Sequence, residues 1–133
     1  MPQGKPPDPD DTGRWQGGRS VRLPNADLAL VERAKIVDYL LNPGHRYGAS
    51  KARFFGQFGF RAEAWGELAL ALREHGRQNE VSSVKETGFG PRYEVEGELT
   101  APDGRRPRVC TVWQLDEGQT GPRLITAFPS EAK

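Results

Sequence analysis

Along residues 32–75 the apolar side chains recur every three or four positions, the spacing that gives an α-helix one apolar face. The pattern predicts three helices, at residues 32–41, 51–58 and 61–75. Ser50 is expected to be the N-cap of the second helix, because its hydroxyl can accept a hydrogen bond from a free backbone N–H. Gly76 fits the residue that follows the last turn of the third helix.

Beyond Gly76 the spacing of apolar residues changes to two, the period of a β-strand. Tyr93, Val95 and Leu99 alternate with glutamates, which predicts a strand with one buried and one solvated face. Residues 108–115 are apolar on both faces and are expected to form a central strand. Turns rich in glycine and proline separate these two strands from further candidates at residues 80–86 and 123–128, which completes an antiparallel meander.

Helices followed by strands predict the α+β class, with N-terminal helices packed on one face of a C-terminal antiparallel β-meander of about four strands. Residues 25–31 fit either the start of the first helix or a short edge strand. Residues 1–24 are polar and rich in proline and glycine, so we expect a disordered N-terminal arm. Residues 25–133 are expected to form a single α+β domain.

The amino-acid composition indicates the cellular compartment of the protein more than its function. The chain of 133 residues has a formal net charge of +1, which favours neither a nucleic acid nor a membrane partner. Its single cysteine, Cys110, suits a reducing compartment, and the first residues contain no apolar run of the signal-peptide kind. We therefore expect a cytoplasmic protein with no membrane span. No cofactor or metal motif is present in the sequence, so no cofactor is expected.

One basic segment departs from this charge balance. Gly44 and Gly48 would allow close backbone approach to a ligand, and a predicted helix follows them, the arrangement of an anion or phosphate site. The alternative is an ordinary turn that starts a helix, with its charged side chains in solvent. Residues 43–61 contain no carboxylate and carry His45, Arg46, Lys51, Arg53 and Arg61.

Several other side chains have a structural and a functional interpretation. His45 fits either a loop hydrogen bond or acid–base chemistry. His75, at a predicted helix C-terminus, is expected to be structural, with its charged form favoured by the helix dipole. Tyr93 fits a core position or a base-stacking role. Arg92 and Arg123, each next to a proline, are surface charges or residues at the rim of the sheet that reach a ligand.

A resemblance to a known family rests on a set of spaced residues. The set is Lys35-x3-Tyr39-x-Leu41-Asn42-Pro43-x-His45-x2-Gly48-x2-Lys51-Ala52-x2-Phe55, Trp113 and Arg123-Leu124-x-Thr126. It resembles an uncharacterised family of small bacterial domains that also occur at the C-termini of polymorphic toxin-like proteins. The resemblance spans about residues 30–128. The order of helices and meander is similar to the barnase/colicin-type ribonuclease superfold.

This second resemblance implies metal-independent RNA cleavage. Such a reaction needs a base for the ribose 2′-hydroxyl, an acid for the leaving 5′-oxygen and cations near the phosphorane. It requires the loop before the second helix to lie against the start of the last strand. The catalytic residues would be His45, Lys51 and Arg123, and the substrate-binding residues Arg46, Arg53, Tyr93 and Thr126.

The alternative function is a non-catalytic protein-interaction module of a bacterial toxin or stress system. In that case His45 and Lys51 would serve capping and packing, and the partner would be a cognate protein. The RNA interpretation instead expects RNA as the partner, bound by the basic segment.

Overall fold

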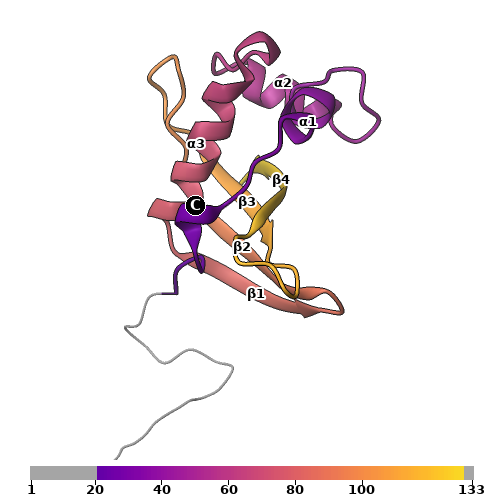
Figure 1. The fold of residues 1–133 in the computed structure, drawn as a ribbon. Coiled ribbons are helices and arrows are strands. Elements are labelled where there is room, and N and C mark those ends of the chain that lie inside the picture. Colours follow the sequence, from indigo (N-terminus) through magenta and orange to yellow (C-terminus); the bar gives the residue numbers. More distant parts are fainter. Residues whose placement is uncertain (1–20, 131–133) are drawn as a thin grey trace, which may run out of the picture.

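The structure, a computed structural model, describes residues 21–130 and has the predicted α+β architecture (Figure 1). The helical elements are η1 (Ala26–Leu28), α1 (Arg33–Lys35), η2 (Ile36–Leu40), α2 (Ala49–Gly56), η3 (Ala62–Ala64) and α3 (Trp65–Gln78), and the strands are β1 (Val81–Thr87), β2 (Gly90–Glu98), β3 (Arg108–Gln114) and β4 (Arg123–Pro129). The elements η1 and η3 are single 3₁₀ turns, and η2 is a π-helical turn. Most of the predicted arm, residues 1–20, lies outside the described residues, whereas Leu23 is buried.

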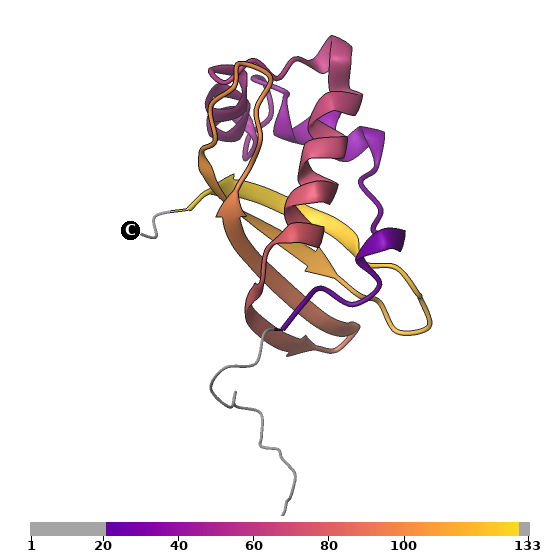
Figure 2. The same ribbon diagram turned by 90° about the vertical axis from the view of Figure 1, so that its left-hand side faces the viewer.

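The strands form one antiparallel sheet in the order β1-β2-β3-β4, the predicted meander. Residues 109–114 of β3 are all buried, as expected of a central strand. Tyr93, Trp113 and Leu124 are cross-strand partners, so their side chains share one face of the sheet. Figure 2 shows α3 lying across this face. The neighbours Arg92 and Gln114 point to the opposite face, which we call the outer face.

Helix α3 begins and ends later than the sequence predicted, since it runs from Trp65 to Gln78. The expectation that Gly76 ends the helix is wrong. Gly76 lies within the helix, where a Cβ would stand 2.8 Å from Cζ2 of Trp113. Glycine therefore lets the fully buried indole of Trp113 pack directly against the helix backbone.

The start of α2 also differs from the prediction. The helix begins at Ala49 with Gly48 as its N-cap, and the exposed Ser50 lies inside the first turn. Ser50 is therefore not the N-cap. The helix ends at Gly56 instead of Phe58, and Gly59 follows it with a φ of +101°.

The predicted first helix is present as α1 followed without a break by η2. In η2 the chain widens into a π-helical turn, closed by the N–H of Leu41 donating to the carbonyl oxygen of Ile36 at 2.8 Å. Such turns occur frequently at functional sites. Residues 25–31 form neither the start of this helix nor a full edge strand. Residues 26–28 form η1, and Leu30 forms a single parallel bridge with Arg123 of β4.

A buried polar network joins α3 to the sheet. Nε2 of His75 lies 2.9 Å from the carbonyl oxygen of Val109 and 3.2 Å from that of Gly97, so Nε2 must carry the proton. Nδ1 then accepts from the Thr111 hydroxyl at 3.0 Å, and this hydroxyl oxygen accepts from Nε1–H of Trp113 at 2.8 Å. The structural role predicted for His75 agrees with this network, whereas the expected charged form does not. Burial lowers the pKa of His75, because it disfavours the imidazolium.

This network predicts a pH-dependent stability. The pKa of His75 is lower in the folded protein than its unfolded value of about 6.5, so the unfolded chain binds a proton that the folded chain does not. The free energy of unfolding should therefore fall as the pH drops from 7.5 through 6.5 towards the folded pKa, by up to about 1.4 kcal/mol per pH unit. Urea titrations at several pH values measure this slope.

Two variants identify the source of this slope. His75→Gln should unfold more easily but with a flatter pH dependence above pH 5, while Arg73→Gln, which removes an exposed charge from the same helix, should keep the wild-type slope. An unchanged slope in His75→Gln would contradict the assignment to His75.

Candidate functional site

Tyr39, in η2, is the centre of a cluster that joins the helical half to the sheet. Its hydroxyl lies 2.9 Å from Oγ1 of Thr126 in β4, and the two groups are hydrogen-bonded. The ring is partly exposed, so the cluster is open to solvent on one side. Tyr39 therefore brings the loop before α2 to the last strand of the sheet.

Two lysines lie over the ring of Tyr39. Nζ of Lys35 is 5.2 Å from the ring centroid, and Nζ of Lys51 is 5.7 Å from it. Both contacts are within the range of a cation–π interaction. Both ammonium groups therefore lie within 5.7 Å of the same ring centroid. Within residues 21–130 neither lysine forms an ion pair with a carboxylate.

His45 completes the cluster through its ring and its Nδ1 atom. Its ring meets that of Tyr39 edge to face, with 5.0 Å between centroids. Nδ1 accepts hydrogen bonds from the backbone N–H groups of Tyr47 at 2.9 Å and Gly48 at 3.0 Å. Because Nδ1 faces two donors, the neutral ring carries its proton on Nε2. His45 thus holds the loop before α2 in place through the N–H groups of Tyr47 and Gly48, without capping the helix, and its Nε2–H is left as a donor.

Gly48 holds the loop against Tyr39. A Cβ atom at this position would overlap the backbone carbonyl oxygen of Tyr39, a group that cannot move without distorting η2. Only glycine therefore allows the loop to approach closely enough for His45 and Lys51 to reach the Tyr39 ring.

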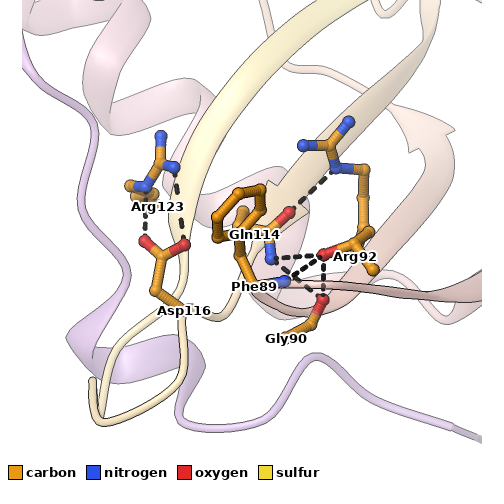
Figure 3. Close-up of polar contacts among 7 residues, drawn as sticks. Phe89, Gly90, Arg92, Gln114, Asp116 and Arg123 are labelled. Carbon is orange, nitrogen blue, oxygen red and sulfur yellow. Dashed lines mark hydrogen bonds and ion pairs between the residues drawn. The ribbon is translucent and has the colours of Figure 1, made fainter.

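The structure brings some of the predicted site residues together and separates others. His45, Lys51 and Thr126 all contact Tyr39, a motif residue for which the sequence predicted no role in the site. The spacing Lys35-x3-Tyr39 could have indicated such a role, because residues four apart share one helix face. Arg123 instead forms an ion pair with Asp116, with Nε and Oδ2 2.6 Å apart, and the hydrogen bond that Arg123 donates to this carboxylate raises the pKa of Arg123 (Figure 3).

The remaining predicted residues lie around or away from the cluster. The guanidinium of Arg46 stacks over the ring of Tyr47, 5.4 Å from its centroid. Arg53 is exposed on α2. Tyr93 lies on the helix-facing side of the sheet, and burial raises the pKa of its hydroxyl. This position agrees with a core residue, and it does not agree with an exposed residue on which a base could stack.

The cluster has the chemistry of an anion site. It offers two ammonium groups, an imidazole N–H and a hydroxyl pair within one small region, and all are donors that suit a phosphate oxygen. In the described part of the chain no three His, Cys, Asp or Glu side chains gather in a way that could hold a metal ion. No helix of residues 21–130 has the length and apolar character needed to cross a membrane.

Comparison with known proteins gives a fold and a family. A search of curated proteins gives no match. A solved structure with a similar fold is a chain of a "contact-dependent growth inhibition toxin - immunity protein complex" from Klebsiella pneumoniae 342, with a TM-score of 0.62 and 17% sequence identity. The alignment covers 80% of this chain and 97% of that chain, and at this identity it shows likeness of fold alone. Residues 22–131 match the family described as "Domain of unknown function (DUF6883)", and because the match covers most of the chain, the protein belongs to this family.

Proposed function

We propose that the protein is an RNA-cleaving domain of a bacterial toxin system and that the Tyr39 cluster binds the scissile phosphodiester. The observation that carries this proposal is the convergence of Lys35, Lys51 and the Nε2–H of His45 on one tyrosine that is tied to β4. Likeness of fold to a chain of a toxin–immunity complex supports the setting. The finer resemblance to the barnase/colicin-type ribonuclease superfold belongs to the same proposal.

The proposed reaction is transesterification of RNA. The ribose 2′-oxygen forms a bond to phosphorus, the bond from phosphorus to the 5′-oxygen breaks, and the proton lost by the 2′-hydroxyl is balanced by one gained at the 5′-oxygen. Lys35 and Lys51 would stabilise the negative charge that builds up on the phosphorane. The hydroxyl of Tyr39 would accept the proton of the 2′-hydroxyl while it passes its own proton to a phosphate oxygen, from which the leaving 5′-oxygen takes a proton. Nε2–H of His45 would donate a hydrogen bond to an oxygen of the phosphate.

The neighbouring cations would position the rest of the strand. Arg46 and Arg53, on the loop and on α2, are proposed to contact flanking phosphates, and Thr126 to orient the Tyr39 hydroxyl through their hydrogen bond. Arg123 would have to leave Asp116 in order to act on the same phosphate. A cognate protein partner that blocks this surface would fit a toxin system.

The experiment is incubation of the wild type with total bacterial RNA in the presence of EDTA, beside two double variants. His45→Ala/Lys51→Ala and Lys35→Ala/Lys51→Ala should each lower the cleavage rate by about 100-fold or more, since each removes charge stabilisation or a donor of the transition state. The second variant leaves the two hydrogen bonds to Nδ1 of His45 intact. Arg73→Ala, which removes an exposed cation on α3, is the matched control and should cleave at the wild-type rate.

Circular dichroism establishes that each variant is folded. Wild-type cleavage that both folded double variants retain would contradict the proposed site. A wild type that neither binds nor cleaves RNA would overturn the RNA function and favour the non-catalytic interaction module.

A further inference from the structure

The outer face carries a line of paired side chains that crosses all four strands and is basic on β1, β2 and β4. Lys85 of β1 pairs with Arg92 of β2, Arg92 pairs with Gln114 of β3, and Gln114 pairs with Arg123 of β4. Directly paired residues of an antiparallel sheet point to the same side. These four side chains therefore form one line on the outer face, which we call the basic row.

Arg92 is fixed in this row by a buried side chain. Its Nε donates to Oε1 of Gln114 at 3.0 Å, and Gln114 is only 1% exposed (Figure 3). Nε2 of Gln114 in turn donates to the carbonyl oxygen of Gly90 at 3.0 Å, and the Thr87 hydroxyl donates to the same oxygen at 2.6 Å. The β1–β2 turn thus orients the amide, and the amide orients the guanidinium.

The terminal Nη groups of Arg92 are left without a carboxylate. Among the described residues Arg92 forms no ion pair, although Arg123 in the same row does. An arginine whose Nε is held by a buried amide keeps its planar fork pre-organised, which suits recognition of a phosphate. Burial of a glutamine is unfavourable unless its polar atoms are bonded, and here these bonds serve to hold Arg92 and the turn.

The basic row is continuous with the Tyr39 cluster. A β-bulge in β4 pairs Leu124 with Trp113 and Thr126 with Val112, so one extra residue lies between them. As a result Thr126 and Arg123, three residues apart, both point to the outer face. Arg123 is about 10 Å from Thr126 along β4, and Arg92 is two strand spacings, or about 10 Å, from Arg123 across the sheet.

Other side chains limit the path across this face. Glu94 and Glu96 lie on the outer face in the next two cross-strand rows, where their charge would repel a phosphate backbone. At the β1–β2 turn, the ring of Phe89 is 75% exposed beside the residues that hold Gln114. An exposed ring beside a line of cations suits a nucleotide base, because every base has an apolar face to stack.

We propose that the basic row is a second phosphate-binding site for the same RNA strand, with Arg92 as its principal contact and Phe89 as a stacking surface. This inference rests on the proposed RNA function. The strand would run from the Tyr39 cluster past Arg123 to Arg92, so the row would contact nucleotides outside the scissile step. Arg92 is here a substrate-positioning residue and takes no part in the chemical step.

Fluorescence anisotropy with labelled 2′-O-methyl RNA tests the row, because this RNA cannot be cleaved through its 2′-oxygen. Arg92→Gln should weaken binding of an octanucleotide by about 3- to 10-fold at about 0.1 M salt and should lower the slope of log K against log salt by about 0.7. The same variant should bind a dinucleotide as the wild type does, since a dinucleotide reaches only the Tyr39 cluster. Arg73→Gln is the control with the same change of charge.

Each outcome has one meaning. A wild type that binds neither RNA overturns the proposed function and the row together. If the wild type binds the octanucleotide and Arg92→Gln binds it equally well, the proposed role of the basic row in RNA binding is wrong, while the proposed RNA function stands. Arg92 would then have a different anionic partner. If Arg92→Gln lost the same affinity for the dinucleotide as for the octanucleotide, the second site would also be contradicted, because Arg92 would then act at the Tyr39 cluster. Gln114→Leu, if folded by circular dichroism, should weaken octanucleotide binding less than Arg92→Gln does.

Discussion

Trp113→Ala is expected to lower the free energy of unfolding by about 3–5 kcal/mol. The indole is fully buried between α3 and the sheet, and its removal leaves a cavity that the rigid strands around it cannot fill. The change also removes the indole N–H that donates to the Thr111 hydroxyl, and this hydroxyl is the group that bonds to His75. Against a total stability of about 5–15 kcal/mol, such a loss should be evident in urea titrations followed by circular dichroism.

A double-mutant cycle with Gly76 provides the control. In the wild type, Gly76→Ala should be destabilising, because the new Cβ would stand 2.8 Å from the indole. In the Trp113→Ala background the same change should be neutral or stabilising by up to about 1 kcal/mol, since alanine is the better helix former and the obstacle is gone. Additive effects of the two changes would contradict the packing described here.

Gly48→Ala is expected to lower the free energy of unfolding by about 1–3 kcal/mol and to weaken RNA binding as strongly as the Lys35→Ala/Lys51→Ala variant. A Cβ at this position overlaps the carbonyl oxygen of Tyr39, so either the loop or η2 must move. Movement of the loop would carry His45 and Lys51 away from the Tyr39 ring. Urea titration and anisotropy with the 2′-O-methyl octanucleotide measure the two effects.

Gly56→Ala is the matched control for this prediction. Gly56 lies in the same helix, and a Cβ there would meet no atom within 4 Å. This variant should be as stable as the wild type or slightly more so, and its RNA affinity should be unchanged. If Gly48→Ala behaved as Gly56→Ala does, the close approach of the loop to Tyr39 would not be what holds the site together.

The sequence predicted the elements well because their signals are local. Apolar spacing located the helices, and the alternation around Val95 together with the continuous apolar run of β3 located the sheet and its central strand. The predicted element boundaries were wrong where a residue distant in the sequence determines the local structure. Gly76 follows a helical run as a terminating glycine would, yet its partner Trp113 lies 37 positions further along the chain, at the interface of α3 with the sheet.

The candidate site was predictable in part for the same reason. The basic segment pointed to His45 and Lys51, and the structure places both beside Tyr39. Charge patterns do not reveal an aromatic centre, so Tyr39 entered only as a motif residue without a predicted role. The pairing of Arg123 with Asp116 depends on the β3–β4 turn, which brings the two together across seven residues. Similarly, the π-helical turn η2 has no sequence signature that apolar spacing can detect.

Cys110, the single cysteine of the chain, lies buried on the outer face of β3 next to Glu94 and Glu96. Burial, with a smaller contribution from these two carboxylates, raises the pKa of its thiol to about 12. Thiol reagents react with the thiolate, so at neutral pH Cys110 should be labelled only when the sheet opens. The native thiol can thus report opening kinetics without an added probe, and a cysteine introduced on the surface can carry a dye without replacement of the native residue.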